Sequence, residues 1–137
     1  MGVVLFVGIS GVLARFLSTE NAERDDVVAL LKAQAAGNAE GMLDHTPGCR
    51  RNPACVARTR ANAISLRRPG AVKILTLKSA TAYSLTGASG KTRVAWTVLG
   101  RLPVVQCVQV RRRGNFVAGI SVALVSIGAP ISNEGDC

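Results

Sequence analysis

The spacing of apolar residues changes its period once along this chain, at Arg67-Arg68-Pro69-Gly70. Between residue 19 and this point apolar residues recur every three or four positions, as on one side of a helix. After it they alternate with polar residues, as in a strand. The separators Gly87-Ala88-Ser89-Gly90, Gly100 with Pro103, and Gly114-Asn115 are too short for crossover helices. We therefore expect helices followed by an antiparallel sheet, an α+β architecture.

Three helices are expected in the first half of the domain. The first begins after Ser18, carries acidic residues near its start and stops at Gly37-Asn38. The same asparagine can cap a short second helix, which ends before Pro47-Gly48. Asn52-Pro53 has the form of a capping residue with proline at the first helical position, and it predicts a third helix to about residue 66.

The second half predicts a curved sheet of four to five strands. Val94, Trp96 and Val98 share one face of the middle strand, and we expect this face to pack on the helices. We expect Trp96 to be a core residue, with a role as a platform for a ligand as the alternative. The expected strands cover residues 71–78, 80–86, 91–99, 104–112 and 116–127.

The N-terminal segment is apolar from residue 2 to 14, and Phe16 and Leu17 extend it past Arg15. As a helix, residues 2–17 would span about 24 Å, short of the roughly 30 Å hydrocarbon core, and snorkelling of Arg15 could extend that reach. We predict that residues 1–18 form an uncleaved signal anchor. A cleaved signal peptide ending near Ala14, or an apolar helix buried in the domain, are the alternatives.

The anchor prediction sets the domain organisation and the compartment. Residues 19–137 form one domain, because a chain of 137 residues is too short for two of ordinary size. We expect a single-pass protein of the cell membrane with its folded domain outside the cytoplasm, or a secreted domain if the segment is cleaved.

The order of these elements resembles the nuclear-transport-factor-2-like superfamily, also called cystatin-like or ketosteroid-isomerase-like. An anchor, a long first helix, the break at AAGNAE, two shorter helices and a strongly bent antiparallel sheet carry the resemblance, over about residues 19–127. The resemblance implies a cone with a pocket between helices and sheet. Members hold ligands there or catalyse isomerase, cyclase or dehydratase reactions, and some are anchored extracytoplasmic domains of unknown role.

Few residues of this chain suit catalysis in such a pocket. A proton-transfer enzyme needs an inward carboxylate or histidine and a tyrosine or acid for the oxyanion. The expected strands contain no carboxylate, and the only histidine is His45. The candidates for the pocket are Asp44, His45, Tyr83 and Trp96. We therefore expect a non-enzymatic accessory or ligand-binding domain without a cofactor, with an isomerase- or dehydratase-like enzyme as the alternative.

The basic residues of the chain must face water, reach back to the N-terminal helix or meet an external anion, and a solvated basic face is the commonest of these cases. Residues 45–133 contain no carboxylate but hold fourteen of the seventeen Lys and Arg residues, and the pI is about 10.5. Arg111, Arg112 and Arg113 are the candidates for contact with anionic lipid or an acidic envelope polymer, as a second alternative function, although a solvated turn is the commoner explanation. Nucleic acid is not expected, because the chain has only five aromatic residues and no recognised nucleic-acid-binding motif.

The four cysteines predict two disulfides. Zinc needs paired ligands two to four residues apart or a set of four His and Cys residues, whereas His45, Cys49 and Cys55 give three ligands at awkward spacing. A thioredoxin-type pair needs two intervening residues where CRRNPAC has five. An even number of cysteines in an exported chain is typical of disulfides. Three pairings are possible. We favour the local Cys49–Cys55, which leaves Cys107–Cys137 and would tie the tail across the sheet. The oligomeric state stays open.

Overall fold

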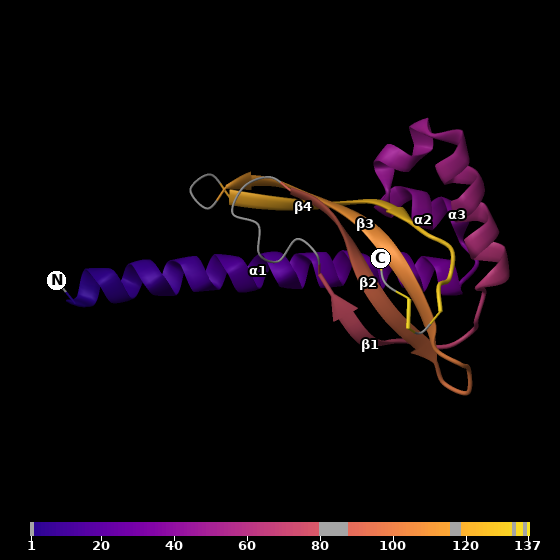
Figure 1. Cartoon of the computed structure of the whole chain (residues 1–137), viewed down its shortest axis with the longest axis horizontal. Helices are drawn as coiled ribbons and strands as arrows, with labels where there is room; N and C mark the ends of the chain where they lie inside the picture. Colours follow the sequence, from indigo (N-terminus) through magenta and orange to yellow (C-terminus); the bar gives the residue numbers. More distant parts are fainter. Residues whose placement is uncertain (1, 80–87, 116–118, 133, 136) are drawn as a thin grey trace.

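The computed structural model describes residues 2–79, 88–115, 119–132, 134, 135 and 137, with side chains except at 2, 3, 5–7, 11–20, 88, 115 and 120. Helices come first and strands second, as the change of period predicts (Figure 1). The strands form one antiparallel sheet in the order β1-β2-β3-β4. The α+β class is therefore confirmed.

The elements are α1 (Gly2–Ala35), α2 (Ala39–His45), the 3₁₀ helix η1 (Pro47–Arg51), α3 (Pro53–Ser65), β1 (Val72–Lys78), β2 (Ala88–Val98), β3 (Val104–Asn115) and β4 (Gly119–Ile127).

Helix α1 is one continuous helix, where the sequence predicts an anchor followed by a separate helix. Residues 15–24 contain no glycine or proline, so nothing breaks the helix there. It ends where predicted: Gly37 has φ 72°, its N–H bonds the carbonyl of Gln34 at 3.0 Å, and the N–H of Asn38 bonds that of Ala33 at 2.9 Å. Among the residues described, no helix is both long and apolar enough to cross a membrane.

The short helices begin at the predicted caps. The side-chain oxygen of Asn38 accepts from the N–H of Gly41 at 2.9 Å, and that of Asn52 accepts from the N–H groups of Ala54 and Cys55. Pro53 occupies the first turn of α3. The 3₁₀ helix η1 between α2 and α3 was not predicted from the sequence.

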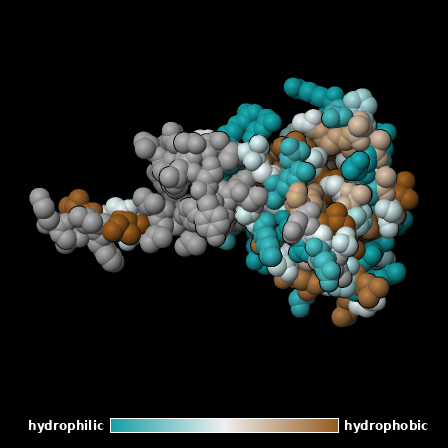
Figure 2. Space-filling view, viewed as in Figure 1, coloured by the Kyte–Doolittle hydropathy of each residue, from teal (hydrophilic) through white to brown (hydrophobic). Residues whose placement is uncertain are grey.

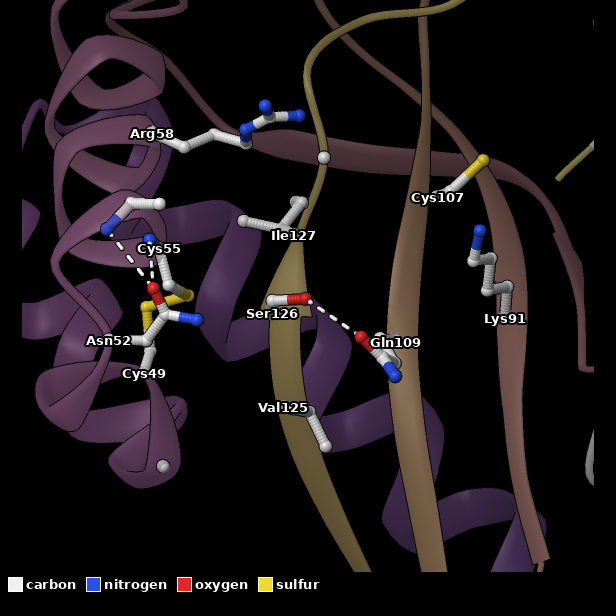
Figure 3. A pocket seen from close by; sticks show the side chains of 13 residues that line it. Cys49, Asn52, Cys55, Arg58, Lys91, Cys107, Gln109, Val125, Ser126 and Ile127 are labelled. Carbon is white, nitrogen blue, oxygen red and sulfur yellow. Dashed lines mark hydrogen bonds between the residues drawn. A yellow bond between two sulfur atoms is a disulfide. The ribbon is translucent and has the colours of Figure 1, made fainter.

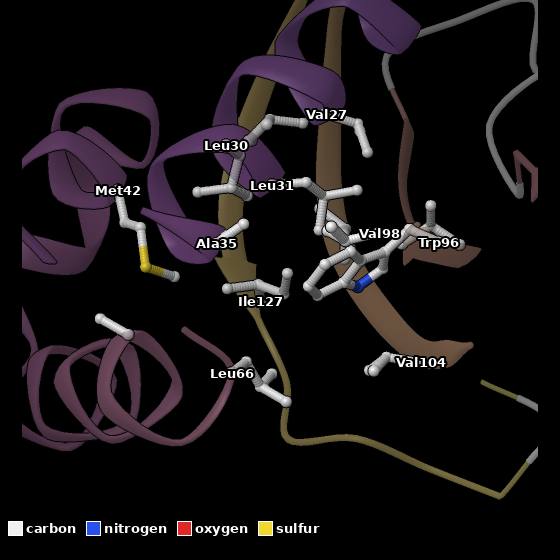
Figure 4. Packing of buried hydrophobic residues seen from close by; sticks show 14 of the residues in the cluster. Val27, Leu30, Leu31, Ala35, Met42, Leu66, Trp96, Val98, Val104 and Ile127 are labelled. Carbon is white, nitrogen blue, oxygen red and sulfur yellow. The ribbon is translucent and has the colours of Figure 1, made fainter. Parts of the chain in front are cut away.

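The sheet covers α1 with one face (Figure 1). Along β2, Val94, Trp96 and Val98 are all buried on this inner face, as the alternation predicts. They pack against Val27 and Leu31 of α1, and the core extends to α2, α3 and the ends of β3 and β4 (Figure 4). The strand expected at 80–86 lies outside the described residues, so only the four-strand count is established.

The C-terminal tail first pairs with the edge of β3 beyond the end of β4 and then crosses the outer face of the sheet. The N–H of Ile131 bonds the carbonyl of Val105 at 2.8 Å, and Nε of Arg93 donates to the carbonyl of Gly135 at 2.9 Å. The Cys107–Cys137 disulfide fastens the end of the tail to the middle of β3. The two faces of the sheet are thus covered by different parts of the chain: α1 on the inner face and the tail on part of the outer face.

Candidate binding groove

A groove of about 410 Å³ opens on the outer side of the sheet, beside β4 (Figure 3). Residues of η1 and α3 form one wall, β4 and the start of the tail lie in the middle, and residues of β3 and β2 form the far side. This volume lies within the range of small-ligand sites. We call it the outer groove.

Helix α3 aims its first turns at the outer groove. Asn52, Cys55 and Arg58 follow one another at intervals of three, which places them on one side of the helix. Figure 3 shows the three side chains on the wall that faces β4. The sequence predicts a capped helix start at this stretch. The capping residue Asn52 also lines the outer groove.

A row of polar side chains crosses the groove from β4 to β2, away from the wall that α3 forms. Lys91 of β2 pairs with Gln109 of β3, and Gln109 pairs with Ser126 of β4. Because residues in register across neighbouring strands point to the same face, all three lie on the outer face. The hydroxyl of Ser126 donates to Oε1 of Gln109 at 3.4 Å (Figure 3).

Both disulfides of the structure join the predicted pairs, Cys49–Cys55 and Cys107–Cys137. The first closes a separation of six residues and fixes η1 against the first turn of α3. Its sulfurs lie in the wall of the outer groove, and Cys107 lies on the far side. CRRNPAC is therefore a structural element of the groove wall.

Arg50, inside the Cys49–Cys55 loop, provides the link to α2. Its guanidinium bonds Asp44 at 2.6 Å and Glu40 at 3.1 Å on the surface. The hydrogen bonds to Asp44, and then to Glu40, raise the pKa of Arg50 above its ordinary value. Exposed pairs of this kind stabilise a fold only slightly. Their effect here is to orient the loop and to occupy the carboxylate of Asp44.

Among the described residues, side chains fill the interior between the C-terminal half of α1 and the sheet, where the resembled superfamily places its pocket. Trp96 is fully buried, and its indole Nε1 donates to Oε1 of Gln106 at 2.8 Å. Gln106 and Gln34 exchange amide hydrogen bonds of 3.1 and 2.9 Å. Gln106 also donates to the carbonyl of Gly128, as does Asn62 of α3. This network closes the interior at the end of α1.

The sequence-predicted pocket residues do not meet in the described structure. Asp44 is exposed, His45 is half-buried at the end of α2, and Trp96 lies in the core. Tyr83 lies outside the described residues. A second hollow, of about 200 Å³, adjoins the C-terminal end of α1. Neither this hollow nor the outer groove is lined by Asp44, His45 or Trp96.

The arginine triplet is split between the two faces of β3. Arg111 and Arg113 are exposed, but Arg112 is only 2% exposed and points to the inner face. The expectation that Arg112 contacts an external surface is therefore wrong, because successive residues of a strand point to opposite faces. Surface contact by Arg111 and Arg113 stays a prediction.

One buried carboxylate was missed by the sequence reasoning. Glu23 of α1 is 1% exposed and accepts hydrogen bonds from the hydroxyls of Thr92, at 2.6 Å, and Ser79, at 2.9 Å. The signal was available, because Glu23 precedes Val27 by four residues and Leu30 by seven and so lies on the same side of the helix. The described residues contain no cluster that could hold a metal ion.

Comparison of the chain with protein-family models, curated proteins and solved structures finds no match in any of the three.

Proposed function

We propose that this chain is a non-enzymatic binding domain that works outside the cytoplasm and holds its ligand in the outer groove. The observation that carries this proposal is the filled interior: Trp96, Gln34 and Gln106 occupy the space where a cone-like fold would hold a substrate. The outer groove is open and is bordered by polar side chains from α3 and three strands. Binding at a preformed surface groove therefore suits this geometry better than chemistry in an enclosed pocket.

The proposed compartment rests on the disulfides and on the N-terminal segment. Two disulfides in a small domain are typical of oxidising surroundings outside the cytoplasm. The N-terminal end of α1 extends beyond the rest of the chain (Figure 1), and the atoms described there include hydrophobic ones (Figure 2). Val4 is 79% and Ile9 54% exposed. We propose that residues 2–17 attach the domain to the cell membrane, with secretion after cleavage as the alternative.

The relationship to the nuclear-transport-factor-2-like superfamily is likewise a proposal. Its support is the order of the elements: a long helix and two shorter ones precede an antiparallel meander that packs one face on the long helix. The isomerase- or dehydratase-like alternative has less support, because Asp44 is tied to Arg50 at the surface and Trp96 is in the core. Fold alone does not select a function.

An anionic-surface module is the second candidate. Arg111 and Arg113 are both exposed on the outer face of β3 and could contact lipid headgroups or an envelope polymer. Each such residue contributes about 1 kcal/mol near an anionic membrane surface.

A variant that fills the outer groove tests the main proposal. Ser126→Trp would place an indole over β4 at the middle of the groove, whereas Ser121→Trp places the same side chain at an exposed position of the same strand outside it. A panel of acidic, neutral and basic oligopeptide probes is titrated into each protein by calorimetry. We expect probes that bind the native protein to be lost in Ser126→Trp and retained in Ser121→Trp. Unchanged binding in the Ser126→Trp protein would remove the groove as the site.

A further inference from the structure

We propose, building on the proposed binding function, that the ligand of the outer groove is an extended molecule carrying oxyanions, carboxylate or phosphate, at two or more points. Arg58 and Lys91 are the two residues that would receive them. Four observations carry this inference: the charge of the lining, the hydrogen-bonding atoms it leaves over, the length of the polar row and the fixed position of the walls.

The outer groove is lined by two cations and no acid. Arg58 extends from α3 on one side and Lys91 stands on β2 on the other (Figure 3). Both are exposed, and neither forms an ion pair within the part of the chain that the structure describes. None of the residues that line the groove is Asp or Glu, so the lining itself provides no side-chain counterion. Arg50, close to α2, differs from these two cations because it forms ion pairs with two carboxylates.

The polar groups of the lining have donors left over and most of their acceptors occupied. Oδ1 of Asn52 accepts from two backbone N–H groups, which can only donate, so the orientation of the amide is fixed and its NH₂ group is left over. Oε1 of Gln109 accepts from Ser126, which leaves its NH₂ group. The carbonyl of Cys107 accepts from the N–H of Gly128, whose own carbonyl accepts from Asn62 and Gln106. A ligand rich in acceptors fits such a lining.

The polar row sets the length of the ligand. Lys91, Gln109 and Ser126 stand on three neighbouring strands, so the row is about 10 Å long at the usual spacing between strands. Arg58 lies beyond Ser126, on the wall that α3 forms (Figure 3). A row of this length suits a ligand longer than a single small anion such as inorganic phosphate. A short acidic oligomer can.

The walls are held in place before any ligand arrives. The Cys49–Cys55 disulfide fixes the loop before α3, and the Cys107–Cys137 disulfide fastens the tail that follows Gly128. A site that is already ordered loses little conformational entropy on binding. The backbone of the groove wall and of the tail therefore does not have to become ordered when a ligand binds.

The test uses three probes of similar length: hexaglutamate, a linear polyphosphate and the neutral peptide hexaglutamine. Each is titrated by calorimetry into the native protein, into Arg58→Gln/Lys91→Gln, and into the control Lys73→Gln/Arg101→Gln. The control removes the same net charge from exposed positions outside the groove, on β1 and on the β2–β3 turn. We expect at least one anionic probe to bind the native protein, about tenfold or more weaker binding in the groove variant, and a change below about twofold in the control. Added salt should weaken binding.

The outcomes separate this inference from the proposed function. Tighter binding of hexaglutamate than of polyphosphate assigns carboxylate as the ligand chemistry, and the reverse assigns phosphate. If hexaglutamine binds as well as hexaglutamate and Ser126→Trp abolishes both, the groove is a binding site but the oxyanion inference fails. Equal losses in the groove variant and the control, or no binding of either anionic probe, also overturn the inference. Binding that Ser126→Trp leaves intact defeats the proposed function itself.

Discussion

Gln106 is the residue through which four parts of the fold are joined. Its side chain contacts the indole of Trp96 on β2, the amide of Gln34 on α1 and the carbonyl of Gly128 at the start of the tail. Asn62 of α3 reaches the same carbonyl. Buried polar groups that are fully hydrogen-bonded define one arrangement of a core, because any other arrangement leaves some of them unsatisfied.

Replacing Gln106 should therefore destabilise the protein strongly. Gln106→Leu would leave the indole N–H of Trp96 and the amide of Gln34 without this partner in the core, at a cost of about 2–4 kcal/mol in the free energy of unfolding. The matched control is Gln109→Leu, on the exposed face of the same strand, for which we expect a change within about 0.5 kcal/mol. Urea unfolding followed by circular dichroism measures both. Equal effects of the two substitutions would contradict this account of the network.

The sequence allowed part of this residue-scale description to be predicted. Alternation placed Val94, Trp96 and Val98 in the core correctly, because a strand with one buried face leaves a period of two in its side chains. The same rule places Gln106 and Arg112 on the inner face, but polar residues at inward positions are identified only once the register is known. The spacing of Glu23 from Val27 and Leu30 indicates that it is buried, but its partners Ser79 and Thr92 lie 56 and 69 residues away in sequence and could not be predicted.

At the scale of elements, the two disulfides hold different structures. Cys49–Cys55 closes a separation of six residues within the helical wall, and Cys107–Cys137 closes one of thirty and fastens the tail to β3. The chain-entropy argument makes the longer loop the more stabilising of the two. The predicted caps at Asn38 and Asn52 were correct because capping depends on local sequence. The 3₁₀ helix between α2 and α3 was not predicted.

Removal of each disulfide should have its own consequence. Cys107→Ser/Cys137→Ser should lower the free energy of unfolding by about 4 kcal/mol, and Cys49→Ser/Cys55→Ser by about 2 kcal/mol. Thermal unfolding of the native protein and both variants measures the difference, and peptide mapping without reduction checks the pairing in protein isolated from cells. A larger loss on removing Cys49–Cys55, or free thiols in the isolated protein, would contradict the assignment of roles and compartment.

At the scale of the whole molecule, the candidate site is formed by segments far apart in the sequence. Residues 48–58, Lys91, Gln109 and residues 125–128 meet only because β4 lies between α3 and the rest of the sheet. The sequence predicted the Cys49–Cys55 disulfide and identified the interval 45–133 as cationic without acids. It could not place Lys91 and Gln109 on the same groove, because that requires the register of three strands. The resemblance instead predicted a pocket in the interior, which core residues fill in the described part of the chain.

The central claim is that ligands bind in the outer groove and not between α1 and the sheet. Amide chemical-shift mapping of the ¹⁵N-labelled protein during titration with hexaglutamate tests it directly. The account predicts the largest shifts at Asn52, Arg58, Gln109 and Ser126, with the indole N–H resonance of Trp96 unmoved. Largest shifts at Trp96, Gln34 and Gln106, with the groove residues unaffected, would place the site in the interior and contradict the account.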